Sequence, residues 1–163
     1  MAVLGKKDSG KTFIIEEILK RLSDKYKILV LKHVSKQTFE IDIPGKDSWR
    51  FKKSGAHAVG IISKSRTALI MDTKHEMDPV DTIRNIEKIL GYEFDLVLME
   101  GFSNVVGSNK AVYKIIAIRN KKDVEYFLGR IDGPILAMFS RGKTDFDNGI
   151  PDIEDIDNVV SKI

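Results

Sequence analysis

Residues 5–12 read GKKDSGKT, and their types and spacing match G-x-x-x-x-G-K-[ST], the pattern of a phosphate-binding loop. Gly5 and Gly10 allow the backbone to turn back on itself, so that successive N–H groups point inward at one anion. The N–H groups of the loop interior belong to Lys7, Asp8 and Ser9. The alternative interpretation is a surface turn rich in glycine and lysine before a helix.

The two residues that close the motif carry most of its chemistry. We expect the Lys11 ammonium to reach the β- and γ-phosphates of a nucleotide and the Thr12 hydroxyl to ligate Mg²⁺. An amphipathic helix should follow the loop and direct the positive end of its dipole at the same phosphates. The motif therefore predicts a site for a nucleoside triphosphate with Mg²⁺.

A second candidate group lies in the stretch DLVLMEG, residues 95–101, where four apolar residues are followed by a carboxylate. Such a strand would end beside the phosphate-binding loop, where Glu100 could hold Mg²⁺ or orient a water molecule. Gly101 would let the backbone come close to a γ-phosphate. The alternative is a buried strand whose next residue happens to be acidic.

The segment 34–56 departs from a plain strand–helix–strand unit, so we expect it to be functional. Asp42 could be a second carboxylate on the Mg²⁺ side, directly or through water, or a solvated acid on a hairpin. If the residues after Pro44-Gly45 form a short helix, Lys46, Arg50 and Lys53 share one face. That face could contact a phosphate-bearing partner or substrate, or it could be a solvated surface.

Residues 120–123 read NKKD and match N-K-x-D at the end of a predicted strand. In GTPases this motif recognises guanine, because the aspartate accepts hydrogen bonds from N1–H and N2–H, which adenine lacks. The pattern therefore marks Asn120 and Asp123 as candidate nucleotide-binding residues. The alternative is a charged turn in a lysine-rich chain.

The elements that must position these residues alternate between strands and helices, which predicts an α/β fold with a mostly parallel sheet. Strands are expected at 2–4, 28–31, 59–62, 68–71, 96–99, 113–118 and 134–139, with a strand or hairpin arm at 38–43. Helices are expected through 14–22, from 47 or 48 to 54, and at 79–90, 124–128 and 153–163, and a polar loop at 103–110. The first strand is short, so either the native chain begins upstream of Met1 or the strand has few residues.

Length and composition limit the classes of protein to which the chain can belong. The chain has 163 residues and should form one domain over 1–163. Its net charge is +3, with 27 basic and 24 acidic residues, so nucleic acid is not the expected partner. The chain lacks cysteine, a signal peptide and an apolar run of membrane-spanning length, so we expect a cytoplasmic protein without membrane contact.

Four stretches together resemble the molybdopterin-guanine dinucleotide biosynthesis protein B family of GTP-binding proteins. They are GKKDSGKT from Gly5, LKH from Leu31, FEIDIPGKDSWRFKKSGA from Phe39 and DLVLMEGF from Asp95. The run D-x-P-G-K-D-S-x-R in the third stretch is far more specific than the phosphate-binding loop alone. The resemblance of these stretches covers residues 1–102. The remainder of the chain resembles the family only in the general order of its strands and helices.

The resemblance implies a simibi-like P-loop NTPase fold with an extra hairpin and short helix after the second strand. It implies binding of GTP and Mg²⁺ with at most weak GTPase activity, a homodimer, and a partner enzyme, molybdopterin guanylyltransferase. Lys11, Thr12 and Glu100 would take phosphate and Mg²⁺ roles. The signature segment would contribute Asp42, Lys46, Asp47, Ser48 and Arg50, of which the last four would face a partner or a substrate phosphate.

Two other interpretations remain open from the residues alone. A nickel-inserting GTPase would need a site built from cysteine and histidine, but the chain has no cysteine and no histidine pair at ligand spacing. A small-molecule kinase could use residues 34–56 as its acceptor site, although an arginine-rich lid is not evident.

Overall fold

The computed structural model describes residues 1–36, 39–140, 156–161 and 163 of the chain. Contacts divide the chain into two compact units, one formed by Met1–His33 with Leu90–Ile163 and the other by Val34–Ile89. Each unit has a sheet of its own. The single domain expected over 1–163 stays a prediction.

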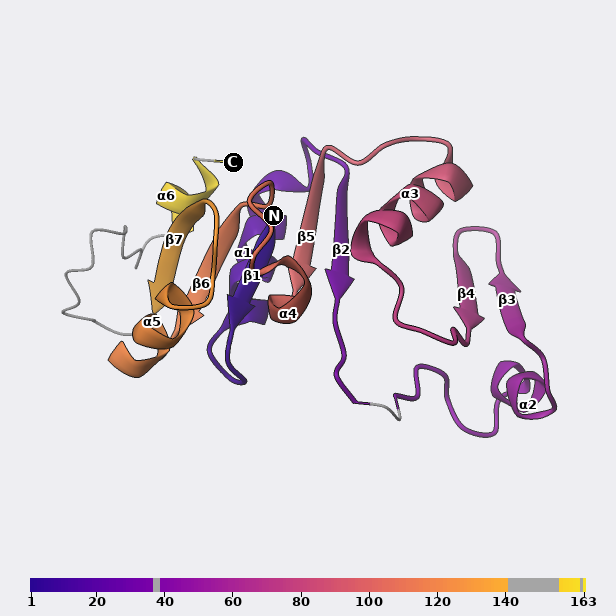
Figure 1. Cartoon of the computed structure of the whole chain (residues 1–163). Helices are drawn as coiled ribbons and strands as arrows, with labels where there is room; N and C mark the ends of the chain where they lie inside the picture. Colours follow the sequence, from indigo (N-terminus) through magenta and orange to yellow (C-terminus); the bar gives the residue numbers. More distant parts are fainter. Residues whose placement is uncertain (37–38, 141–155, 162) are drawn as a thin grey trace. The chain divides into compact units, whose positions relative to one another are not determined.

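A five-stranded parallel sheet forms the centre of the first unit, with the strand order β2-β5-β1-β6-β7 (Figure 1). Its strands are β1 (Ala2–Gly5), β2 (Ile28–Lys32), β5 (Leu96–Glu100), β6 (Lys114–Ile118) and β7 (Ile135–Ser140). Because β1 lies between β5 and β6, the loop after β1 leaves the middle of the carboxyl edge, where ligands of such sheets bind. The mostly parallel α/β fold predicted from the sequence is confirmed.

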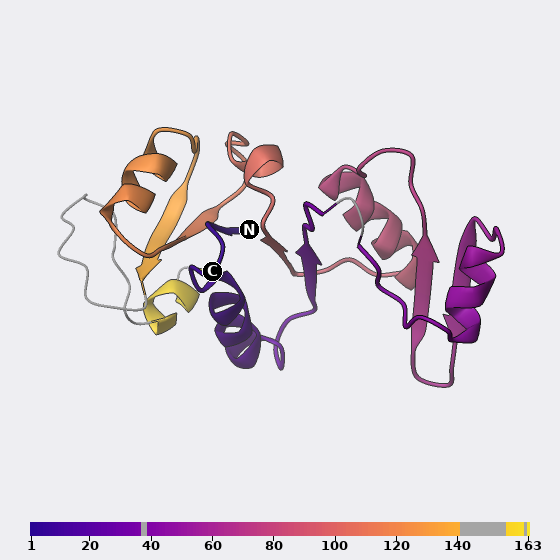
Figure 2. The ribbon, with the colours of Figure 1, turned by 90° about the horizontal axis from the view of Figure 1, so that it is seen from below.

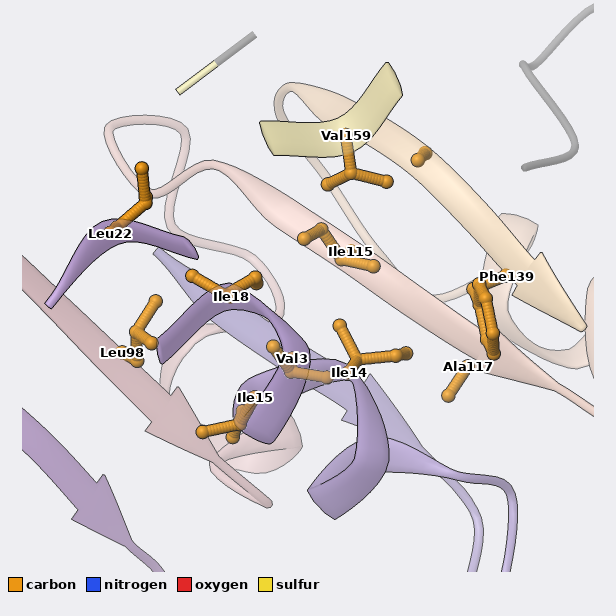
Figure 3. Packing of buried hydrophobic residues seen from close by; sticks show 11 residues of the cluster. Val3, Ile14, Ile15, Ile18, Leu22, Leu98, Ile115, Ala117, Phe139 and Val159 are labelled. Atoms are coloured by element: carbon orange, nitrogen blue, oxygen red, sulfur yellow. The ribbon is translucent and has the colours of Figure 1, made fainter. Parts of the chain in front are cut away.

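Helices cover both faces of this sheet, because successive side chains of a strand point to opposite sides. The helices are α1 (Lys11–Leu22), α4 (Ser103–Val106), α5 (Lys121–Leu128) and α6 (Ile156–Val160). Val3 packs with buried residues of α1 and α6 (Figure 3), whereas Ala2 and Leu4 pack with those of α4 and α5. Figure 2 shows the two pairs of helices on opposite sides of the sheet.

Several sequence predictions for this unit need correction. The polar loop expected at 103–110 begins with the short helix α4, whose Val106 is buried in the core. The closing helix expected at 153–163 is described only as α6, since 141–155 and 162 lie outside the described residues. Ile163, the last residue of the expected helix, is 46% exposed.

A buried lysine lies at the amino-terminal edge of the sheet, opposite the phosphate-binding loop. Lys114 is fully buried, and its ammonium donates to the carbonyl oxygens of Asn109, Val112 and Asp132 at 2.7–2.8 Å. These three bonds use all three donors of the ammonium group. Lys114 therefore ties together the loops before β6 and before β7.

The second unit contains a two-stranded antiparallel sheet and two helices. Its elements are α2 (Asp47–Lys53), β3 (Ala58–Ile62), β4 (Thr67–Met71) and α3 (Pro79–Leu90). Ser63 closes the hairpin between the strands, because its N–H and its hydroxyl both donate to the Arg66 carbonyl. The short helix expected after the second strand is thus present, whereas the hairpin of this unit is formed by β3 and β4 and not by the arm expected at 38–43.

Two details of the second unit differ from the sequence predictions. Residues 39–43 are not a strand, while 37 and 38 lie outside the described residues. Helix α2 begins at Asp47 with Lys46 as its N-cap residue, and no side chain caps it. Neither Asp47 nor Ser48 therefore caps this helix. None of the helices in the described part of the chain is both long and apolar enough to span a membrane.

Candidate functional site

The predicted phosphate-binding loop connects β1 with α1 and has the backbone of an anion cradle. Asp8 and Gly10 have φ values of 60° and 98°, both in the left-handed region, and these turn the loop sharply. A Cβ on Gly5 would lie 2.6 Å from the Ala117 carbonyl oxygen and would also overlap the Ser9 hydroxyl. Glycine at position 5 therefore lets the loop pack against the end of β6.

Polar groups inside the loop are available to an anion. The Ser9 hydroxyl is buried and has no hydrogen-bond partner in the described part of the chain. Gly10 is the N-cap residue of α1, and no side chain caps this helix. The first N–H groups of α1 thus lack an intrahelical partner and carry the positive end of the helix dipole. An orphan hydroxyl and an uncapped helix start are the features that a phosphate group would satisfy.

Lys11 begins α1 and is held close to the loop. Its ammonium donates to the Lys6 carbonyl oxygen at 2.7 Å. Burial lowers the pKa of the Lys11 ammonium from its ordinary value, whereas the carboxylates of Glu100 and Asp8 act in the opposite direction. The lysine is therefore partly desolvated, which strengthens its attraction to an entering phosphate.

Glu100 lies at the carboxyl end of β5, beside the phosphate-binding loop, as predicted. It is only 9% exposed, and its carboxylate oxygen lies 3.4 Å from the Thr12 hydroxyl. The ammonium of Lys32 lies 3.5 Å from the same carboxylate. Mg²⁺ prefers oxygen ligands and usually combines one or two protein groups with phosphate oxygens and water. Thr12 and Glu100 fit that pattern.

A cavity of about 420 Å³ opens over the loop. Its lining consists of Lys7, Asp8, Ser9, Gly10, Lys11, Thr12, Phe13, Lys32 and Glu100. All of these residues belong to the first unit. Nowhere in the described ranges do three or more histidine or carboxylate side chains gather at a metal-binding distance.

Lys32 is a site residue that the sequence analysis did not single out. Parallel pairing of β2 with β5 places Lys32 directly opposite Glu100. This pairing joins residues that are far apart in the chain, so no local pattern reveals it. Two weaker signals were its position directly after the predicted strand 28–31 and its place in the stretch LKH.

Gly101 follows Glu100 with a φ of 85°, which explains why glycine stands there. His33, the residue after β2, lies beside Gly101, and its N–H donates to the Glu100 carbonyl oxygen at 2.9 Å. The His33 ring also packs against Phe102, with 5.3 Å between ring centroids. The approach of Gly101 to a γ-phosphate stays a prediction.

Asn120 and Asp123, the predicted guanine-reading residues, lie where β6 passes into α5. The Asn120 side chain caps α5 by accepting the Asp123 N–H at 3.2 Å. Asp123 is 1% exposed and is paired with Arg119 and Lys6. Hydrogen bonds from Arg119 and Lys6 lower the pKa of Asp123 from 3.8 to about 2. Both side chains are engaged within the protein, and recognition of guanine stays a prediction.

The other candidate residues belong to the second unit, so the structure does not relate them to the loop. Asp42 accepts a hydrogen bond from the Ile43 N–H at 2.8 Å. Arg50 and Asp47 form an exposed ion pair at 3.7 Å, and Lys46 precedes the same helix. A role of Asp42 at Mg²⁺ and a role of Lys46, Asp47, Ser48 and Arg50 at a partner or substrate phosphate stay predictions.

The family model described as "Molybdopterin guanine dinucleotide synthesis protein B" matches residues 1–141 of the chain. A Methanocaldococcus jannaschii protein, named as an adapter protein of molybdopterin-guanine dinucleotide biosynthesis, is 38% identical over 122 residues. That match covers 74% of this chain and 47% of the relative, so it spans less than half of the relative's length.

A Haemophilus influenzae protein named molybdopterin-guanine dinucleotide biosynthesis adapter protein is 27% identical over 164 residues. The match covers all of this chain and 86% of that protein. The crystal structure of Bacillus subtilis MobB is similar to the chain with a TM-score of 0.74 and 24% identity, over 99% of this chain and 96% of that one. At this identity the solved structure supports the fold alone.

Proposed function

The chain belongs to the molybdopterin guanine dinucleotide synthesis protein B (MobB) family, and we propose on this premise that it is a GTP-binding accessory protein of molybdenum-cofactor biosynthesis. Its task is to assist the molybdopterin guanylyltransferase that attaches GMP to molybdopterin. Relatives named as adapter proteins of this biosynthesis support the proposal. We also propose that the protein works in the cytoplasm, because a chain of 163 residues without cysteine suits a reducing compartment.

The loop between β1 and α1 is the observation that carries nucleotide binding. Its interior holds the orphan Ser9 hydroxyl and the uncapped start of α1, and Lys11 lies at its rim. In the proposed complex these groups bind the phosphates, with the Lys11 ammonium at the β- and γ-phosphates. Lys11 would then exchange its bond to the Lys6 carbonyl for a stronger charge-assisted bond to phosphate.

Mg²⁺ is the proposed cofactor beside these phosphates, where it would neutralise charge on the phosphate oxygens. The Thr12 hydroxyl and the Glu100 carboxylate are the residues that would hold it, as their 3.4 Å separation supports. Entry of the cation would replace Lys32 as the positive neighbour of Glu100. Glu100 is the one buried carboxylate among the residues that line the cavity. We propose at most weak GTPase activity.

A titration of the chain with GTP and ATP, with and without Mg²⁺, tests the proposal. We expect GTP to bind more tightly than ATP and Mg²⁺ to strengthen binding. Lys11→Ala should abolish measurable GTP binding with an unchanged far-UV circular dichroism spectrum, because it removes the ammonium from the phosphate site. Lys25→Ala, an exposed lysine after α1, is the matched control.

Unaltered GTP affinity in Lys11→Ala would contradict the phosphate-site assignment. A preference for ATP, with transfer of its labelled γ-phosphate to a small acceptor, would instead favour a kinase of the same fold.

A homodimer is the proposed assembly, and the exposed apolar side chains of the second unit support it. Ile62 and Leu69, on neighbouring strands of the hairpin, are 82% and 51% exposed. Clustered exposed apolar side chains of this kind usually mark a protein interface. Sedimentation velocity over a range of concentrations should show a dimer. Ile62→Asp should shift it toward monomer, and a monomer at every concentration would contradict the proposed assembly.

A further inference from the structure

We propose that Asp123, together with Arg119 and Lys6, is a positioning unit that holds the phosphate-binding loop in its anion-binding shape, in place of reading the guanine base. The inference rests on the proposed function, since it assumes that the loop binds nucleotide phosphates. In this inference the aspartate of the N-K-x-D pattern binds cations of its own chain.

The Asp123 carboxylate already accepts hydrogen bonds at both oxygens. Oδ1 pairs with the Lys6 ammonium at 2.8 Å. Oδ2 accepts from Arg119 Nε at 2.9 Å and from the Arg119 backbone N–H at 3.2 Å. The side chain is 1% exposed, so almost none of it faces a ligand in solution. A carboxylate can only accept, and its acceptor sites face groups of the same chain.

The two cations around Asp123 connect it directly to the phosphate-binding loop. Lys6 is itself a loop residue, and its carbonyl oxygen accepts the Lys11 ammonium at 2.7 Å. Arg119 donates from its guanidinium to the Lys7 carbonyl oxygen at 3.2 Å. Asp123 therefore holds two successive loop residues. It binds the Lys6 side chain directly, and it holds the Lys7 backbone through Arg119.

An aromatic side chain of α5 supports the same arrangement. The Lys6 ammonium lies 4.8 Å from the centroid of the Tyr126 ring, which is a cation–π distance. Tyr126 lies in the same helix as Asp123, so the Lys6 side chain is directed by two groups of α5. Because α5 packs its Val124 and Phe127 into the core, this anchor is rigid.

Recognition of guanine by Asp123 would require these bonds to break. The carboxylate would have to leave Lys6 and Arg119 and become accessible, which leaves two cations without their shared anion. The carboxylate is buried, although the side chains of Lys6 and Arg119 are 37% and 42% exposed. Guanine would offer this anion two N–H donors without a positive charge, in exchange for two cations. Positioning the loop is therefore the role that this geometry favours.

The test compares ligands with and without a base. Tripolyphosphate has the phosphate groups but no base, so a loop-positioning residue affects its binding and a base-reading residue does not. We expect Asp123→Asn to weaken GTP, ATP, XTP and tripolyphosphate by the same factor, about 5- to 30-fold, since a less ordered loop binds every phosphate chain less well. Glu125→Gln, the same chemical change at an exposed site of α5, is the matched control.

A second variant separates the positioning role from overall folding. Arg119 has no carboxylate with which to accept hydrogen bonds from guanine. Arg119→Met removes the hydrogen bond to the Lys7 carbonyl oxygen. We expect Arg119→Met to weaken tripolyphosphate binding as Asp123→Asn does. The loss of affinity in the double variant should be smaller than the product of the two single losses, because both residues act in one unit. Hydrogen exchange at residues 6–10 should accelerate in both, while β6 amides stay protected. If Asp123→Asn does not fold, Arg119→Met and its exchange pattern carry the test.

The possible results are distinguishable. If Asp123→Asn binds XTP better than GTP, or weakens GTP while tripolyphosphate is unchanged, the residue reads the base and the inference is overturned. Unchanged affinity for every ligand in both variants would overturn it as well. A wild-type chain that binds neither GTP nor tripolyphosphate would overturn the proposed function and this inference together.

Discussion

The two units of the protein differ in how much apolar surface each buries. All five residues of β6 are buried, and helices cover both faces of the sheet that contains it. In the second unit Val59 is the one buried residue of the described β3 and β4, and α2 has none. A two-stranded sheet is at most marginally stable alone in water, so the second unit needs further contacts that the first does not.

This contrast indicates a division of tasks. The first unit has the packing to hold the proposed phosphate site in a fixed geometry, which an anion cradle requires. The second unit carries the family's signature segment on a lightly packed scaffold, as expected of a surface that binds other molecules. Three predictions test the contrast, from the largest expected effect to the smallest.

The largest effect is expected in the core of the first unit. Ile116→Ala should lower the free energy of unfolding by about 2–5 kcal/mol, because it leaves a cavity in a fully buried site. Ile41→Ala, at a side chain that is 67% exposed in the second unit, should change it by less than about 0.5 kcal/mol. Urea denaturation of both variants measures the difference. Equal losses would show that the second unit is as tightly packed as the first.

An intermediate effect is expected on acidification. The pKa of Asp123 is about 2 in the folded protein against an ordinary value of 3.8. A lowered folded pKa stabilises the protein above pH 4, and this contribution of about 2 kcal/mol is lost as the pH falls toward 2. The difference in stability between wild type and Asp123→Asn should therefore shrink from pH 6 to pH 2. A constant difference would mean that the ion pairs do not stabilise the fold.

The smallest effect on fold and nucleotide binding is expected at Arg50. Its side chain is 70% exposed, so Arg50→Lys should keep the melting temperature and keep GTP affinity within several-fold. The variant should still lose most of the stimulation of guanylylation in a reconstituted assay, because lysine cannot reproduce the two-pronged geometry of a guanidinium. Arg66→Lys, in the β3–β4 turn, is the control.

Full stimulation of guanylylation by Arg50→Lys would indicate that the exposed cations of α2 are solvated and do not contact the partner. A marked fall in its melting temperature would instead make Arg50 a structural residue of the second unit.

The sequence predicted the parts of the fold that depend on local patterns. The phosphate-binding loop, the apolar stripe of α1 and the acid-ending strand β5 are visible because neighbouring residues define them. Antiparallel pairing of β3 with β4 in a separate sheet depends on contacts between strands, which periodicity alone does not contain. The short α4 was missed because its few residues read as a polar loop.

The same holds for the candidate site: residues in local motifs could be predicted, and residues placed by strand pairing could not. Thr12 and Glu100 were placed correctly beside each other, because a known motif and a strand end fixed them. Lys32 and Arg119 were not found, since their roles depend on register and on pairing across the sheet. The N-K-x-D pattern marked Asp123 as a candidate but did not predict its burial, which only the packing of α5 reveals.

The buried Lys114 has a consequence for how the first unit can be handled. Backbone carbonyl oxygens are also the groups with which proteins coordinate metal cations, and here three of them surround an ammonium of the chain itself. This counter-charge cannot dissociate, so neither dialysis nor a chelator removes it. We therefore expect a chelator such as EDTA to leave this part of the fold intact, so that any change that it causes in nucleotide affinity tests the Mg²⁺ proposed beside Thr12 and Glu100.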